Sequence, residues 1–318
     1  MPFVPPKSYL PNPLLRNGHV HTIYPALFRR VQKRYNRRER IVLSDGDFLD
    51  VDLLISGNPR VVLLIHGLEG SSESKYMLGA TKFYSDRGYD IAALNLRSCS
   101  GEMNLAQRLY HHGVTDDVHE ALEWLAPSYK KVYLMGFSLG GNLVLKYLAD
   151  QNFTIPGNVR SGVAVSAPVD LPSCVKEVHK RSRKLYHDRF LRDLKEKIRQ
   201  KALQQPTPNA QLVDRIRTLK EFDDFFTAPI HGFRDANDYH QKASSLQDLP
   251  NLRRPALLLN ALDDPILGHG CFPQKEVEKT RDLYAIYPKF GGHVGFCDDP
   301  KKGYFSERMG LEFFQENS

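Results

Sequence analysis

The feature that most constrains the fold is an alternation of apolar segments with amphipathic ones through the middle of the chain. Residues 61–65 are all apolar, which is typical of a strand buried in a parallel sheet. The segments with strand character are 60–65, 89–96, 131–137 and 159–166. The segments with helical character lie between them, at 75–86, 115–125 and 139–149. Strand, helix and strand in this repeated order predict a mostly parallel central sheet with helices on both faces.

The alternation stops near residue 170. Residues 171–245 have no clear strand pattern, and their apolar residues recur at helical spacing between Lys and Arg. Further strands are expected at 40–43, 48–55, 256–260 and 283–287, and a last helix at 303–314. We therefore predict an α/β core at 39–170 and 246–318, a helical lid insertion at 171–245, and an N-terminal arm at 1–38 packed on the core.

Composition and cysteine spacing indicate an ordinary globular protein. The 318 residues are 41% apolar and 25% charged, which is enough to bury a core. The first residues contain no apolar leader segment, and no apolar run approaches the ~20 residues of a membrane span. Cys99, Cys174, Cys271 and Cys297 have no metal-type spacing, so free thiols are the simplest interpretation. We expect a soluble, cytoplasmic protein, and the sequence does not indicate its oligomeric state.

The positive charge is concentrated in two segments. Residues 29–40 carry +6 and residues 176–201 carry +7, while the rest of the chain carries −6, which gives a formal net charge of +7. A charge run of this kind is most often a solvated helix face. Peripheral contact with an anionic membrane surface is the alternative. No zinc-finger or RNA-binding motif accompanies these segments, so we expect no nucleic-acid partner.

The strongest motif is G-x-S-x-G, formed by Gly136, Phe137, Ser138, Leu139 and Gly140. It follows an expected strand directly and precedes an expected helix. In that context it predicts a sharp turn that exposes the serine hydroxyl as a nucleophile. Glycines are needed on both sides, because larger side chains would collide in so tight a turn. The alternative is a glycine-rich turn with a structural serine.

A serine nucleophile needs a base and an acid to orient the base. In proteins with a G-x-S-x-G turn, the order along the chain is the serine, then the acid, then a histidine as the base. His293 lies between glycines just after the last expected strand. The acid should follow the preceding strand, where Asp263 and Asp264 compete. We select Asp264, because hydrolases with a G-x-S-x-G turn usually place the acid directly before a proline and an apolar residue. Asp263 would then form the turn, and Asp170 is a weaker third candidate.

The proposed chemistry also requires two backbone donors for an oxyanion. We assign them to Leu68, in the loop that follows residues 60–65, and to Leu139, the residue after the nucleophile. His66 would then hold that loop. No H-E-x-x-H or comparable cluster is present, so we expect no metal and no cofactor.

Several motifs together resemble the YheT-like family of α/β hydrolases, which is related to the eukaryotic α/β-hydrolase-domain proteins 1 and 3 and to yeast medium-chain ethyl-ester synthases. Ser98 and His21 depart from the family pattern, which usually has Gly and Gln there. The eukaryotic members have an N-terminal membrane anchor that we do not find here. The matching blocks are residues 17–25, 66–71, 97–102, 109–111, 136–141, 260–265 and 291–296.

The resemblance implies the α/β-hydrolase fold and hydrolysis of carboxylic esters, with medium-chain acyl esters or lipids as substrates. We expect Ser138 to form an acyl-enzyme, His293 to act as the base, and Asp264 to orient the imidazole. One alternative is an alcohol O-acyltransferase that uses the same three residues. Another is a phospholipase or binding module at a membrane surface.

Overall fold

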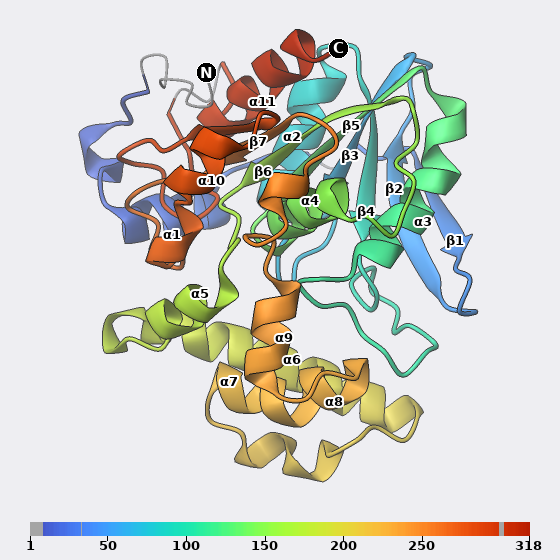
Figure 1. Ribbon diagram of the computed structural model, residues 1–318, viewed down its shortest axis with the longest axis vertical. Coiled ribbons are helices and arrows are strands. Elements are labelled where there is room, and N and C mark those ends of the chain that lie inside the picture. Colours follow the sequence, from blue (N-terminus) through green and yellow to red (C-terminus); the bar gives the residue numbers. More distant parts are fainter. Residues whose placement is uncertain (1–8, 33, 299–301) are drawn as a thin grey trace.

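One mixed sheet organises the protein. The computed structural model describes residues 9–32, 34–298 and 302–318. Within them an eight-stranded sheet has the order β1-β2-β4-β3-β5-β6-β7-β8 (Figure 1). Strands β3 to β8 are parallel, whereas β2 is antiparallel to both β1 and β4. The prediction of a mostly parallel sheet is confirmed. The strands are β1 (Arg37–Val42), β2 (Phe48–Leu54), β3 (Arg60–Ile65), β4 (Asp90–Asn95), β5 (Lys131–Phe137), β6 (Val159–Val165), β7 (Ala256–Leu259) and β8 (Leu283–Ile286).

Helices cover both faces of this sheet because both faces of its central strands are apolar. Side chains alternate along a strand, so Val61 and Leu63 of β3 pack with one layer of helices and Val62 and Leu64 with the other. The first layer contains α3 (Thr115–Leu125) and α4 (Leu139–Ala149). The second contains α2 (Lys75–Ser85) and α11 (Phe305–Glu316). A short helix, α10 (Gln274–Lys279), precedes β8.

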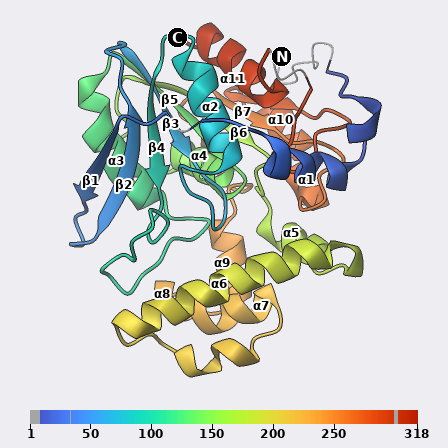
Figure 2. The same ribbon diagram turned by 180° about the vertical axis from the view of Figure 1, so that it is seen from behind.

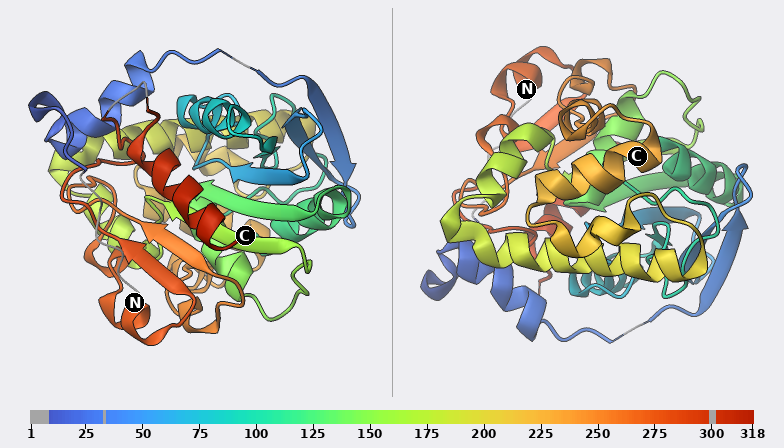
Figure 3. Two further views of the ribbon diagram at one scale, coloured as in Figure 1. Left: turned by 90° about the horizontal axis from the view of Figure 1, so that it is seen from above. Right: turned by 90° about the horizontal axis from the view of Figure 1, so that it is seen from below.

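The segment between β6 and β7 is helical, as the sequence predicts. Residues 171–245 contain no strand and form a separate layer beneath the sheet (Figures 1 and 2). Seen from below, this layer lies across the core (Figure 3). We call residues 171–245 the helical insertion. Its helices are α5 (Leu171–Val178), α6 (Lys184–Gln204), α7 (Leu219–Phe222), α8 (Ala228–His231) and α9 (Ala236–Ala243), with a π-helical turn at Asp223–Thr227.

Helix α6 corrects one interpretation of the basic segments. Most of its charged side chains are exposed, but Lys197 and Lys201 are buried. The Lys197 Nζ lies 3.2 Å from a carboxylate oxygen of Glu69, and the Lys201 Nζ donates to the backbone oxygen of Asn104 at 2.5 Å. These two lysines therefore join the insertion to loops of the core and do not belong to a solvated face.

The N-terminal segment contains a helix, α1 (Gly18–Phe28), which Asn17 caps by accepting hydrogen bonds from two backbone N–H groups. Gly18 packs against the loop after β7, since a Cβ there would lie 1.8 Å from the backbone oxygen of Asp263. Residues 1–8, where we expect no leader segment, lie outside the described residues. Among the helices that the structure describes, none is long and apolar enough to cross a membrane.

Candidate active site

Ser138 occupies the tight turn that the motif predicts. It joins β5 to α4 with φ +53° and ψ −120°, a conformation that non-glycine residues rarely adopt. A Cβ on Gly136 would lie 2.0 Å from the Gly140 oxygen, and one on Gly140 would lie 2.3 Å from the Ile65 oxygen. Both positions therefore exclude any side chain, which explains the glycine spacing of the motif.

His293 bridges the serine and an aspartate. Its Nε2 lies 2.9 Å from the Ser138 Oγ, and its Nδ1 lies 2.8 Å from the Asp264 Oδ2. The Asp264 Oδ1 lies 3.2 Å from the same Nδ1 and accepts the backbone N–H of Ile266 at 2.8 Å. The Asp264 side chain is fully buried and that of His293 is 9% exposed. The fold thus brings together three side chains that are far apart in the sequence.

Asp263 has a different environment. Its Oδ1 accepts the backbone N–H of Gly292 at 2.8 Å, and burial raises the pKa of its carboxyl. Its Oδ2 has no hydrogen-bond partner among the described residues. Asp263 therefore holds the backbone of the histidine loop, while Asp264 contacts the imidazole. Asp170, the third candidate, is at the N-cap position of α5.

The N-terminal helix α1 supports the histidine loop. The Thr22 Oγ1 accepts the backbone N–H of His293 at 2.8 Å and donates to the Gly18 oxygen at 2.6 Å. His21 is buried in the same helix, and its Nε2 accepts the backbone N–H of Cys297 at 2.9 Å. Sequence reasoning gave Thr22 and His21 no role. The only signal was that both lie in the 17–25 block of the family resemblance.

The two expected oxyanion donors belong to residues that line one cavity with Ser138. Leu139 is the first residue of α4, so its N–H has no partner within the helix. Leu68 lies in the loop after β3 and lines the same cavity as Ser138 and Leu139. His66 holds this loop, since its Nε2 accepts the Leu96 N–H at 3.1 Å. Burial lowers the pKa of His66 to about 4, which keeps the ring neutral.

Two cavities meet at Ser138. The first lies between the core and the helical insertion, and most of its wall is apolar. The second lies between α1 and α6 and includes His293, which the first does not. Apolar side chains of the first cavity include Leu109, Val178, Phe190, Leu194, Ile198 and Phe226. Side chains of the second include Ile23, Leu27, Lys75, Tyr186 and Arg189.

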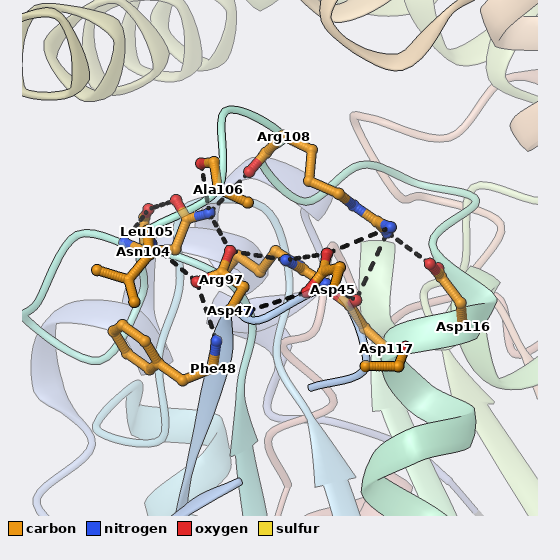
Figure 4. Close-up of polar contacts among 12 residues, drawn as sticks. Asp45, Asp47, Phe48, Arg97, Asn104, Leu105, Ala106, Arg108, Asp116 and Asp117 are labelled. Carbon is orange, nitrogen blue, oxygen red and sulfur yellow. Dashed lines mark hydrogen bonds and ion pairs between the residues drawn. The ribbon is translucent and has the colours of Figure 1, made fainter. Parts of the chain in front are cut away.

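A buried polar network holds the loop between β4 and α3, which forms part of the first cavity (Figure 4). The Arg97 guanidinium contacts Asp47 at 2.6 Å and Asp117 at 2.7 Å. The Asn104 side chain donates to the same Asp47 at 2.5 Å and to the backbone oxygen of Arg108 at 2.7 Å. Because every charged group in it is paired, the ion pairs and hydrogen bonds of this network offset the desolvation penalty of burying its charges. Arg97 was noted in the sequence only as part of a family motif.

In the part of the chain that the structure describes, no candidate metal centre lies beside these groups. Among residues 9–32, 34–298 and 302–318, no three His, Cys, Asp or Glu side chains are arranged to hold a metal ion. Cys174 and Cys271 have their sulfur atoms 3.2 Å apart and are free thiols, as are Cys99 and Cys297.

Comparisons with known proteins show the family and the fold. A family model described as "alpha/beta hydrolase fold" matches residues 60–271. The chain is 35% identical to the protein named "Putative esterase YheT" of Escherichia coli (strain K12), covering 91% of this chain and 87% of that protein. It is 26% identical to a monoacylglycerol lipase of Saccharomyces cerevisiae, over 94% of this chain and 65% of that one.

Human phospholipase ABHD3 is 24% identical over 97% of this chain and 79% of its own length. Among solved structures, the Pyrococcus furiosus esterase Pf2001 superimposes with a TM-score of 0.59 at 16% identity, covering 91% of this chain and 98% of that one. At that identity, the structural likeness concerns the fold alone.

Proposed function

Since the chain belongs to the α/β-hydrolase fold family and is an ester-hydrolysing enzyme, we propose that it is a serine esterase in which Ser138, His293 and Asp264 are the catalytic residues. One observation carries this proposal, namely the continuous path of hydrogen bonds from the Ser138 Oγ through the imidazole to the Asp264 carboxylate. That path is the arrangement that activates a serine hydroxyl at neutral pH.

The mechanism follows from the positions of these atoms. The Ser138 Oγ attacks the ester carbonyl while the His293 Nε2 takes its proton. The carbonyl oxygen becomes an oxyanion, which the N–H groups of Leu68 and Leu139 stabilise. The alcohol then leaves with the proton from His293, and an acyl group remains on Ser138. Water, deprotonated by the same imidazole, attacks this acyl-enzyme. The carboxylic acid is released as the Ser138 Oγ leaves and takes the proton back from His293.

The two cavities have different roles in this mechanism. His293 must deliver its proton to the leaving alcohol, so the alcohol lies on the side of the imidazole. The cavity that includes His293 is therefore the alcohol cavity, and the one without it is the acyl cavity. The acyl cavity has apolar walls and lies under residues 171–245, so we propose that the helical insertion is a lid that sets the acyl-chain preference.

We propose medium-chain acyl esters as substrates, including lipid esters. The apolar acyl cavity supports an acyl chain over a small polar acid. Phe226, which is fully buried at the cavity wall, limits how long that chain can be. The names of two relatives, a monoacylglycerol lipase and a phospholipase, support a lipid ester. The mechanism requires no cofactor.

A series of p-nitrophenyl esters from acetyl to palmitoyl tests both the chemistry and the chain length. Wild-type enzyme should release a burst of about one nitrophenolate per active site, because the acyl-enzyme accumulates. Ser138→Ala should release none. The rate should be highest for medium chains, and Phe226→Ala should move the optimum to longer chains.

Phe314→Ala is the matched control, because Phe314 is equally buried but packs between the sheet and α11 on the far face. It should lose similar stability without changing the chain-length optimum. A flat chain-length profile in the wild type would overturn the medium-chain proposal. A burst from Ser138→Ala would overturn the nucleophile.

A further inference from the structure

Helix α1 has an apolar stripe on its outer side. Val20, Tyr24, Leu27 and Phe28 are 44%, 43%, 67% and 63% exposed. Their spacing places all four on one face of the helix, beside the face formed by the buried Gly18, His21 and Pro25 that pack on the histidine loop. The outward face of a surface helix is normally polar. A contiguous apolar face of this kind marks an interaction surface.

The surroundings of this stripe are strongly basic. The first 38 residues contain no Asp or Glu, and Glu39 is the first acidic residue of the chain. The exposed cations Arg16 and Arg30 flank α1 in the sequence, and Lys75 and Arg189 are exposed on the neighbouring α2 and α6. An apolar stripe bordered by cations complements a surface with an apolar interior and negatively charged headgroups.

The stripe is continuous with the alcohol cavity. Leu27 belongs to the stripe and also lines that cavity. The neighbouring cations Lys75 and Arg189 line the cavity as well. Whatever covers the stripe therefore lies beside the entrance through which an ester reaches Ser138. A bilayer in that position could supply a lipid ester directly, whereas a protein partner would obstruct the entrance.

We propose that α1 is an interfacial helix that lies on an anionic lipid bilayer, with Val20, Tyr24, Leu27 and Phe28 in its apolar zone and the alcohol cavity facing the lipid. The location of the stripe and its charges is independent of the catalytic assignment. The delivery of substrate to Ser138 rests on the proposed function.

Co-sedimentation with vesicles tests the proposal. The full chain is mixed with vesicles of phosphatidylglycerol and phosphatidylcholine, or of phosphatidylcholine alone, at low and high salt. It should pellet with the anionic vesicles at low salt and much less in the other conditions, because screening weakens the attraction of cations to the surface. The variant V20E/F28E should bind on the order of tenfold more weakly or worse, since it loses the burial of two apolar side chains.

The matched control is V42E/L203E, which changes two apolar positions elsewhere that are even more exposed, at 76% and 88%. Val42 lies on β1, at the opposite side of the molecule from α1 (Figure 1). Leu203 is at the far end of α6, about 25 Å along that helix from Tyr186. This control should bind vesicles like the wild type, and both double variants should hydrolyse dissolved p-nitrophenyl butyrate at the wild-type rate.

Three results would overturn the proposal. The first is equal binding by V20E/F28E and V42E/L203E, and the second is no binding of the wild type to anionic vesicles. The third is a wild type that forms a dimer in light scattering, becomes a monomer as V20E/F28E and pellets with no vesicle, which would assign the stripe to a second copy. Loss of esterase activity in Ser138→Ala concerns only the catalytic proposal, so the two can fail separately.

Discussion

The choice between two adjacent aspartates gives the sharpest test of the site. Asp264→Asn leaves a side chain of the same shape. The backbone N–H of Ile266 still needs an acceptor, so the amide oxygen takes the place of Oδ1. The amide NH₂ then faces the His293 Nδ1, where the Asp264 Oδ2 lay at 2.8 Å. Since NH₂ only donates, the Nδ1 must accept, and the ring proton moves to Nε2. In that tautomer, Nε2 cannot take the proton of Ser138.

The expected loss is large for this reason. An aspartate that fixes the imidazole tautomer is worth roughly 10⁴-fold in kcat where the same arrangement has been tested. That factor corresponds to about 5 kcal/mol of transition-state stabilisation. The rate of p-nitrophenyl butyrate hydrolysis measures it, and a thermal melt close to that of the wild type shows that the variant is folded.

Asp263→Asn is the matched control. The new side chain keeps an oxygen for the Gly292 N–H, and its NH₂ replaces an oxygen that has no hydrogen-bond partner among the described residues. We expect kcat to fall by less than about tenfold, because the imidazole tautomer is unchanged. An Asp263→Asn enzyme that loses as much activity as Asp264→Asn would refute the assignment of the acid.

Three further changes test the turn, the α1 support and a buried imidazole. Gly140→Ala places a Cβ 2.3 Å from the Ile65 oxygen, so it should cost on the order of 4 kcal/mol of unfolding free energy; an unchanged urea midpoint would contradict this. Thr22→Val leaves the His293 N–H unpaired at a cost of about 1–3 kcal/mol, so kcat should fall roughly tenfold or more. A kcat equal to that of the wild type would exclude a role for Thr22 in supporting the histidine loop. Burial lowers the pKa of His66 from 6.5 to about 4, so as the pH falls the unfolded chain takes up a proton at this residue before the folded one does. The free energy of unfolding therefore decreases as the pH falls between those two values. His66→Gln should make this dependence on pH less steep in urea titrations, and an identical dependence would count against the buried neutral ring.

The core and the nucleophile could be predicted because their signals are local. The expected strand at 60–65 and the expected helix at 139–149 match β3 and α4 to the residue. A strand buried on both faces must be apolar at every position, and a turn as tight as that at Ser138 requires glycines at fixed positions. One short stretch of sequence is therefore enough to identify each.

Helix α1 was not predicted, because Pro25 lies inside it and proline normally ends a helix. Asn17, which caps it, was an available signal. The contact of Thr22 with His293 spans 271 residues of sequence, and that of Lys201 with Asn104 spans 97. Such pairs depend on where the fold brings distant loops, and a single sequence contains no pattern that specifies them.

Labelling with a fluorophosphonate tests the central claim most directly, because the reagent reacts covalently with an activated serine and with few others. The account predicts one adduct on wild-type enzyme, which mass spectrometry of the digested protein locates on Ser138. Ser138→Ala should remain unlabelled, and Asp264→Asn should be labelled far more slowly than Asp263→Asn. An adduct of equal yield on Ser138→Ala, or one located on another serine, would contradict the account.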